Sequence, residues 1–221
     1  MPKKSQQRAD SKKQSWPEQL VVRLTALHDT PAANPAVTIE SFELGDGLSS
    51  AKARALLKRA NARRADDGDE ALELPPEVEA LVRVVDGIDL RFSVANANGA
   101  ISCNIAIVPL KDVIFDVGPA PIEDQLNWSL LSVTNGDAAL GQDAGILFTD
   151  GDGCARSEFV PLQATVDTMV ACLGVEGWEL TMWSSIDDFE DEAREVAANL
   201  DFFRQTLRVE TPRFGKRIPR P

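Results

Sequence analysis

Near residue 88 the spacing of apolar residues changes from a helical period to a strand period. In EVEALVRVV, at 77–85, apolar residues recur at intervals of three and four, as on one face of an α-helix. From residue 88 onward, IDLRFSV and AISCNIAIV alternate apolar and polar residues, and the NANG between them is typical of a hairpin turn. A short helix that leads through an Asp86-Gly87 turn into an antiparallel β-hairpin is therefore the first predicted unit.

Other segments of the chain show either the helical or the strand period, but no sequence unit occurs twice. Gly174, directly after a helical pattern, is placed to end that helix in a left-handed conformation. The order of elements predicts the α+β fold class, with a mixed or antiparallel sheet of about five or six strands wrapped by helices. Helices are expected from residue 16 to about 28 and at 51–65, 161–173 and 185–207, and strands at 36–44, 130–134, 138–140 and 145–149, with ARSEFV as a further candidate.

The same patterns divide the chain into five parts. We expect a disordered basic tail at 1–15, a peripheral helix and linker at 16–36, and the α+β domain at 37–175. A C-terminal helical extension follows at 176–208, and a second basic, mobile tail at 209–221. The extension carries an apolar stripe at helical spacing, which favours packing in the core, with a docking face for a partner or a second subunit as the alternative. The stripe consists of Phe189, Ala193, Val196, Ala197, Leu200 and Phe203.

Charge is distributed unevenly along the chain and indicates the class of partner. The net charge of the 221 residues is −12, and residues 31–203 alone carry −20. Such a field repels nucleic acids and membrane surfaces and attracts basic proteins. A basic protein is therefore the predicted partner, although acidity that only maintains solubility is the simpler alternative. The helix predicted at 51–65 is the one basic element of this middle region.

The residue types needed for common catalytic and cofactor sites are scarce. His28 is the single histidine and lies outside the predicted core, so histidine-based catalysis is disfavoured. Cys103, Cys154 and Cys172 have no metal-ligand spacing and are expected to be buried, reduced thiols. No phosphate-binding loop follows a predicted strand. We expect no cofactor, no metal site and no enzymatic activity. Without a long apolar segment or a secretory signal, the expected location is the cytoplasm.

Acidic residues in predicted loops and turns are the candidates for contact with a basic partner, because loops at one end of a sheet can converge on one surface. Asp150 and Asp152, in TDGDG, also allow a paired-carboxylate enzyme, but a tight turn is the favoured interpretation. Trp178 and Trp183 are expected in the core more than at an interface. The predicted partner-binding residues are Asp86, Asp89, Asp137, Asp143, Asp150, Asp152 and Trp128.

Four segments, taken in order, resemble the SUKH superfamily. They are LELPPEVEALVRVVDGIDL at 72–90, IAIVPLKDV at 105–113, LLSVTNGDAALGQDAGILFTDGDG at 130–153 and FVPLQATVDTMVACLG at 159–174. The resemblance covers roughly residues 40–175 and implies a mixed sheet wrapped by helices, without catalytic residues, to which the C-terminal helix is an addition. Members of the superfamily are commonly immunity proteins that bind and neutralise bacterial toxins, many of them nucleases, and relatives include regulators of fungal cell-wall synthesis.

Two functions follow as hypotheses. The first is a non-catalytic protein-binding module of the immunity type, which covers a basic toxin or nuclease domain. The alternative is a structural or assembly protein that self-associates through its C-terminal helix and its tails.

Overall fold

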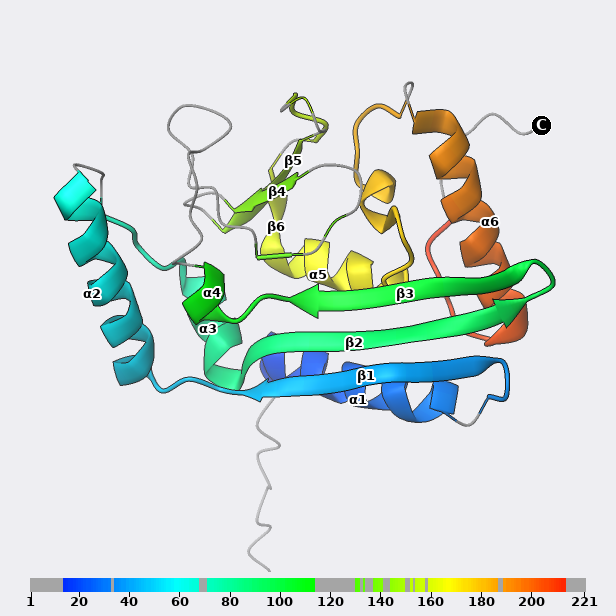
Figure 1. The fold of residues 1–221 in the computed structure, drawn as a ribbon, viewed down its shortest axis with the longest axis horizontal. Helices are drawn as coiled ribbons and strands as arrows, with labels where there is room; N and C mark the ends of the chain where they lie inside the picture. The colour runs from blue at the N-terminus through cyan, green and yellow to red at the C-terminus, as the bar shows by residue number, and fades with distance from the viewer. Residues whose placement is uncertain are drawn as a thin grey trace, which may run out of the picture.

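The fold is an α+β arrangement of two antiparallel sheets and their covering helices (Figure 1). The computed structural model describes residues 14–32, 34–67, 71–113, 130–131, 133, 137–140, 144–149, 152, 154–157, 159–186 and 189–213. In chain order the elements are α1 (Trp16–Ala32), β1 (Val37–Asp46), α2 (Ser50–Asp67), α3 (Pro76–Val84), β2 (Val85–Asn96), β3 (Gly99–Ile107), α4 (Leu110–Val113), β4 (Asp137–Leu140), β5 (Gly145–Thr149), β6 (Val160–Pro161), α5 (Leu162–Ala171), the 3₁₀ helix η1 (Trp178–Thr181) and α6 (Glu190–Thr206).

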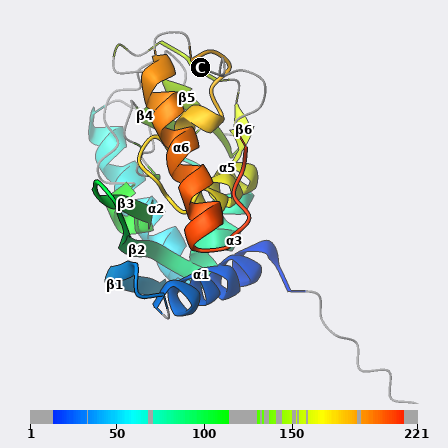
Figure 2. The same cartoon turned by 90° about the vertical axis from the view of Figure 1, so that its right-hand side faces the viewer.

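The larger sheet has the order β1-β2-β3 and contains the predicted hairpin. Asn96 pairs with Gly99 across a two-residue turn, which confirms NANG as the hairpin connection. Apolar residues of β2 and β3 alternate with exposed or half-buried ones, so each strand turns one face to the core. Helices α1, α3 and α5 lie behind that face, and none of the described helices covers the opposite face (Figure 2).

The transition from helix to hairpin is more abrupt than the sequence indicates. Helix α3 ends at Val84 and β2 begins at Val85, so Asp86 and Gly87 lie inside the strand and the predicted turn is wrong. Gly87 has φ +97°, in the left-handed region that glycine tolerates, and a Cβ there would lie 2.8 Å from the ring of Pro109. The Asp-Gly pair therefore allows β2 to pack closely against the segment after β3.

The second sheet, β4-β5-β6, is separate from the first, and the expectation of one sheet with five or six strands is wrong. Its strands contain only four, five and two residues. Within the described part of the chain, β3 forms β-bridges with later residues only at Cys103–Val175 and Ile107–Leu131. Alternating patterns indicate strands but do not state which strands pair, and this explains the error.

One hydrophobic core joins elements from both ends of the chain. Leu20 and Leu24 of α1 are fully buried in it, so α1 is part of the core and not peripheral. Helix α6 begins at Glu190, later than the predicted start at residue 185, and the 3₁₀ helix η1 precedes it at Trp178–Thr181. The stripe of α6 packs inward through Ala193, Val196, Leu200 and Phe203, which confirms the core interpretation.

The first residues of the predicted C-terminal tail are also packed. Thr211 is 8% exposed, and its hydroxyl donates a hydrogen bond to the carbonyl oxygen of Leu200. Arg204 donates to the Thr211 hydroxyl and to the carbonyl oxygen of Pro212. Residues 209–213 therefore form a strap along α6, and the prediction of a mobile tail from residue 209 is wrong for this segment. Residues 214–221 and 1–13 lie outside the described residues.

Helix α2 projects at the end of the molecule opposite α6 (Figure 1). The side chain of Ser49 accepts a hydrogen bond from the backbone N–H of Lys52, as a helix N-cap does. Two alanines, Ala53 and Ala60, are its only buried side chains among those described. Asn61 holds the chain that returns from α2, since its amide both donates to and accepts from the backbone of Leu72, at 2.9 and 2.7 Å.

Candidate protein-interaction surface

The uncovered face of the β1-β2-β3 sheet is made mostly of small and polar side chains around one ion pair. Arg91 and Asp89 of β2 pair there at 2.7 Å, and the Ser41 hydroxyl donates to the same carboxylate at 3.1 Å. The hydrogen bonds from Arg91 hold the pKa of Asp89 below its usual value. Asp89, a predicted contact residue, is thus already engaged by a cation of the same sheet.

Asp86, the second predicted contact residue described here, has a structural role. Its carboxylate accepts a hydrogen bond from the backbone N–H of Leu110 at 2.7 Å, where α4 begins. This contact connects the start of β2 with the segment that follows β3. Asp86 is half-buried, so little of its charge faces a partner.

The remaining predicted contact residues are not brought together by the described part of the chain. Asp152 is exposed in a turn, and Asp137 is described only through its backbone in β4. Asp143, Asp150 and Trp128 lie outside the described residues. A common binding surface formed by these loops stays a prediction.

A groove that no predicted site residue lines lies between the tip of the β2–β3 hairpin, the turn at 175–177 and α6. Its volume is about 640 Å³. Apolar side chains of Ile101, Val175 and Val196 form part of its lining, and all three are buried. The polar residues of the lining are Asn96, Asn98, Ser102, Glu176, Glu192, Glu195 and Asn199, with no basic residue among the described lining.

One wall of the groove is an edge of β3 that is only partly paired. The backbone N–H of Asn104 donates to the carbonyl oxygen of Gly174 at 2.7 Å, next to the Cys103–Val175 bridge. Gly177 then adopts φ +77° and the chain turns into η1, away from the strand. Backbone groups alternate in direction along a strand, so the N–H groups of Ala100 and Ser102 point to the same side as that of Asn104. This short edge faces the groove.

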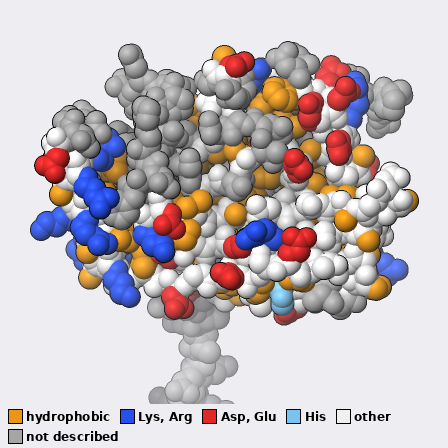
Figure 3. All heavy atoms as spheres, in the orientation of Figure 1, with side chains coloured by type: hydrophobic (Ala, Val, Ile, Leu, Met, Phe, Trp, Pro, Cys, Tyr) orange, Lys and Arg blue, Asp and Glu red, His pale blue; other side chains and the backbone are white. Residues whose placement is uncertain are grey.

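The acidic wall comes from α6 and the turn before η1. In the first turn of α6, Arg194 pairs with Glu190 at 2.6 Å and with Asp191 at 2.5 Å. Glu192 and Glu195 line the groove instead, together with Glu176. None of these three glutamates has an ion pair or hydrogen bond through its side chain within the described chain. Figure 3 shows acidic side chains gathered toward the α6 end and basic ones toward the α2 end.

The sequence carried a usable signal for this groove. Glu192, Glu195 and Asn199 follow at intervals of three and four, which places them along one side of the helix. Acids in the first turns of a helix are also favourable partners of the helix dipole, so their presence alone does not indicate a groove. Nothing local, however, indicates that the hairpin tip lies opposite them.

The other candidates for chemistry are occupied by packing. His28 stacks on Phe42, with ring centroids 4.4 Å apart. Trp178 and Trp183 are 2% and 1% exposed, which confirms their preferred core role. Cys103 and Cys172 are buried as expected, whereas Cys154 is exposed, contrary to expectation. Burial raises the pKa of the Cys172 thiol to about 12 and raises that of Cys103 as well, so neither is a thiolate near neutral pH.

Comparison with known proteins adds no neighbour to this description. No family model, curated protein or solved structure matches the chain. In the part of the chain that is described, no helix combines the length and apolar character needed to cross a membrane. Likewise, no group of three histidine, cysteine, aspartate or glutamate side chains there is arranged to hold a metal ion. The groove and the charge pattern are therefore the features that bear on function.

Proposed function

We propose that this chain is a non-catalytic, SUKH-like protein-binding module of the immunity type, which binds a basic segment of another protein in the acidic groove. The observation that carries the proposal is the placement of Glu176, Glu192 and Glu195, without ion-pair partners in the described chain, around one groove. Carboxylates that lack an internal cation attract lysine and arginine side chains, and the net charge of −12 extends this attraction over distance.

The edge of β3 supplies a way to hold such a segment. An extended peptide gains affinity from main-chain hydrogen bonds when it adds to an exposed strand edge, and specificity from the pockets beside that edge. Here the main-chain groups of Ala100 and Ser102 border the groove that the three glutamates line. Apolar side chains of the ligand would meet Ile101 and Val196, and basic ones the glutamates. A lysine- or arginine-rich surface of a toxin domain has this chemistry.

Assembly through the C-terminal helix, the alternative function, receives no support from the packing of α6. The apolar stripe that would mediate self-association is buried in the core of the same molecule. Exposing it would require loss of contacts made by Leu200 and Phe203, which are 1% and 0% exposed. A partner therefore meets the polar side of α6.

The experiment is a titration, followed by NMR and calorimetry, with a short peptide that alternates valine with lysine and arginine. The control peptide has glutamine at each basic position. We expect the basic peptide to change the chemical shifts of residues 100–102 and 192–199, and the control peptide to leave them unchanged. The variant Glu176→Gln/Glu192→Gln/Glu195→Gln is expected to bind the basic peptide at least about tenfold more weakly. This factor corresponds to a loss of about 1.4 kcal/mol in binding free energy.

A matched variant separates the groove from the overall charge. Glu40→Gln/Glu43→Gln/Glu77→Gln changes the net charge equally at exposed residues outside the groove. We expect this variant to bind nearly as the parent does. Equal weakening by both triple changes, or shift changes spread over the whole surface, would show that no specific basic-peptide site exists in the groove.

A further inference from the structure

Helix α2 has a charge opposite to that of the molecule that carries it. It contains six basic residues, and its two acids, Asp66 and Asp67, stand at its last positions. The chain as a whole has a net charge of −12. The basic residues of α2 are Lys52, Arg54, Lys58, Arg59, Arg63 and Arg64. Basic side chains gather at this end of the molecule in Figure 3.

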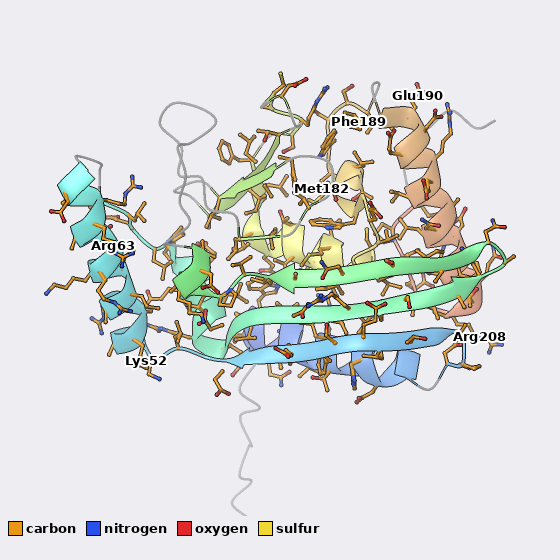
Figure 4. All side chains as sticks on the ribbon, viewed as in Figure 1. Lys52, Arg63, Met182, Phe189, Glu190 and Arg208 are labelled. Atoms are coloured by element: carbon orange, nitrogen blue, oxygen red, sulfur yellow. The ribbon has the colours of Figure 1, made fainter. Side chains whose placement is uncertain are left out.

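Part of this charge has no counterion within the described chain. Lys52 and Lys58 form neither an ion pair nor a hydrogen bond through their side chains there. The guanidinium group of Arg54 donates to the carbonyl oxygen of Ser50 at 3.1 Å and meets no carboxylate among the described residues. All three side chains are exposed. Lys52 lies near the N-terminal end of α2 and Arg63 toward its C-terminal end (Figure 4). The cations without a counterion in the described chain therefore lie in the N-terminal half of α2.

The outward side of α2 allows a close approach. Its buried alanines, Ala53 and Ala60, define the inner side, and Leu56 and Leu57 beside them are half-buried. Alanines occupy the outward positions between the basic residues, and all of them are exposed: Ala51, Ala55, Ala62 and Ala65. With a rise of about 1.5 Å per residue, an 18-residue helix spans about 27 Å, long enough to lie along several turns of another helix.

The acidic groove stands at the other end of the same molecule. Helix α2 and helix α6 lie at opposite ends of the long axis in Figure 1, so the two surfaces of one copy do not meet. Along α6 the groove presents Glu192, Glu195 and Asn199 at intervals of three and four. Arg54 and Lys58 of α2 are four residues apart and form a matching row. Charge and spacing are complementary between copies.

We propose that α2 of one copy docks on the acidic groove of a second copy, head to tail, when no basic partner is present. This inference rests on the proposed function in that the groove accepts basic side chains. Because the two surfaces differ, the contact is heterologous, and assembly continues from copy to copy unless it closes into a ring. A basic partner that enters the groove displaces α2 and returns the protein to monomers. The groove is then both the binding site and the point at which assembly is regulated.

Repulsion between two acidic molecules does not prevent this contact at moderate salt. The whole-molecule repulsion acts between centres that lie many ångströms apart, whereas the groove and α2 meet at contact distance. In about 0.1 M salt the Debye length is about 10 Å. The repulsion between whole molecules is then screened, and the attraction between α2 and the groove is partly retained. At about 1 M salt the Debye length is about 3 Å and the contact weakens too. Assembly is therefore strongest at intermediate salt.

The experiment is sedimentation velocity over a concentration series with two complementary variants. The first, Lys52→Gln/Arg54→Gln/Lys58→Gln, lacks the cations of α2 and keeps the groove. The second, Glu192→Gln/Glu195→Gln, keeps α2 and lacks the charges of the groove. We expect the parent to form concentration-dependent oligomers, each variant alone to remain monomeric, and an equal mixture to give heterodimers and nothing larger. The control Lys111→Gln/Arg208→Gln/Arg213→Gln, exposed residues outside α2, is expected to assemble as the parent does.

The outcomes separate this inference from the proposed function. A parent that stays monomeric at every concentration and salt overturns the head-to-tail contact, while the basic peptide still tests the groove independently. Oligomers of the parent without heterodimers in the mixture also overturn it. Binding of a labelled oligonucleotide by a monomeric parent, lost in the α2 variant, would assign α2 to phosphate groups instead. If the parent forms oligomers, the basic peptide is expected to dissociate them. Oligomers that persist at saturating peptide would contradict the claim that α2 and the peptide bind the same groove.

Discussion

Helices α6 and α2 have nearly equal lengths and opposite relations to the core. Helix α6 buries Ala193, Val196, Leu200 and Phe203, whereas the buried side chains described for α2 are two alanines. The acidic groove is thus built on a helix whose position is fixed by large apolar contacts. Helix α2 carries its cations on an element with little apolar area to hold it. The groove surface is therefore expected to be rigid, whereas α2 is held by few apolar contacts.

The largest expected effect tests that difference directly. Phe203→Ala removes a fully buried aromatic side chain from α6 and is expected to lower the free energy of unfolding by about 3–5 kcal/mol. Leu57→Ala, at a half-buried position of α2, is expected to lower it by only about 1 kcal/mol. Urea denaturation of both variants measures the two values. Similar losses of unfolding free energy in the two variants would contradict the difference between α6 and α2.

A slightly smaller effect is expected in α3, which connects the sheet to the α2 end. Leu81 is 0% exposed on the inner side of this short helix. Leu81→Ala is expected to destabilise the fold by about 2–4 kcal/mol because it leaves a cavity. The exposed Ala80→Ser is the control within the same helix, with a change expected below about 0.5 kcal/mol. A loss below about 1 kcal/mol for Leu81→Ala would mean that the core face of α3 is misassigned.

The strap at 209–213 is expected to stabilise α6 through Thr211. Thr211→Val removes a buried hydroxyl that donates to Leu200 and accepts from Arg204, and is expected to cost about 1–2 kcal/mol. Thermal melting of truncated chains tests the boundary. Removal of residues 214–221 is expected to change the melting temperature little, and so is removal of 1–13, because neither segment offers an apolar face. A truncation after Arg208 that melts like the full chain would contradict the strap.

The smallest effect is a pH dependence of stability that comes from a buried thiol at the C-terminal end of α5. Burial raises the folded-state pKa of Cys172 from 9.0 to about 12. Above pH 9 the unfolded thiol releases its proton and the folded one does not, so this contribution to stability is complete below pH 9 and falls as pH rises toward 12. Cys172→Ala is expected to reduce that slope. Thiol labelling near neutral pH is expected to modify the exposed Cys154 and to spare Cys172, and rapid labelling of Cys172 would contradict its burial.

Local patterns in the sequence predicted the elements well and their arrangement poorly. The hairpin, α2, α3, α5 and the core stripe of α6 follow from period, capping and turn chemistry, which depend on neighbours in the chain. The split into two sheets does not, because an alternating strand such as 145–149 carries no record of its partner.

The candidate site was harder to predict for the same reason. The groove joins residues near 100, 176 and 192, and their proximity is a consequence of the fold. Asp86 and Asp89 are predicted contact residues because they are acidic and near predicted turns. In the fold, one caps a backbone N–H and the other pairs with Arg91. Net charge indicates a basic partner, which stays a prediction. The placement of α6 opposite the hairpin tip, which no local pattern indicates, brings Glu192 and Glu195 to the groove.

The measurement closest to the central claim is the rate at which the basic peptide associates with the protein across a salt series. From about 0.1 M to about 1 M salt the Debye length falls from about 10 Å to about 3 Å, so association is expected to slow steeply while dissociation changes little. Glu176→Gln/Glu192→Gln/Glu195→Gln is expected to associate slowly with a shallow salt dependence, and Asp150→Asn/Asp152→Asn to remain close to the parent. Salt-independent association of the parent, or a steep dependence lost only in the Asp150 and Asp152 variant, would contradict the acidic groove as the site.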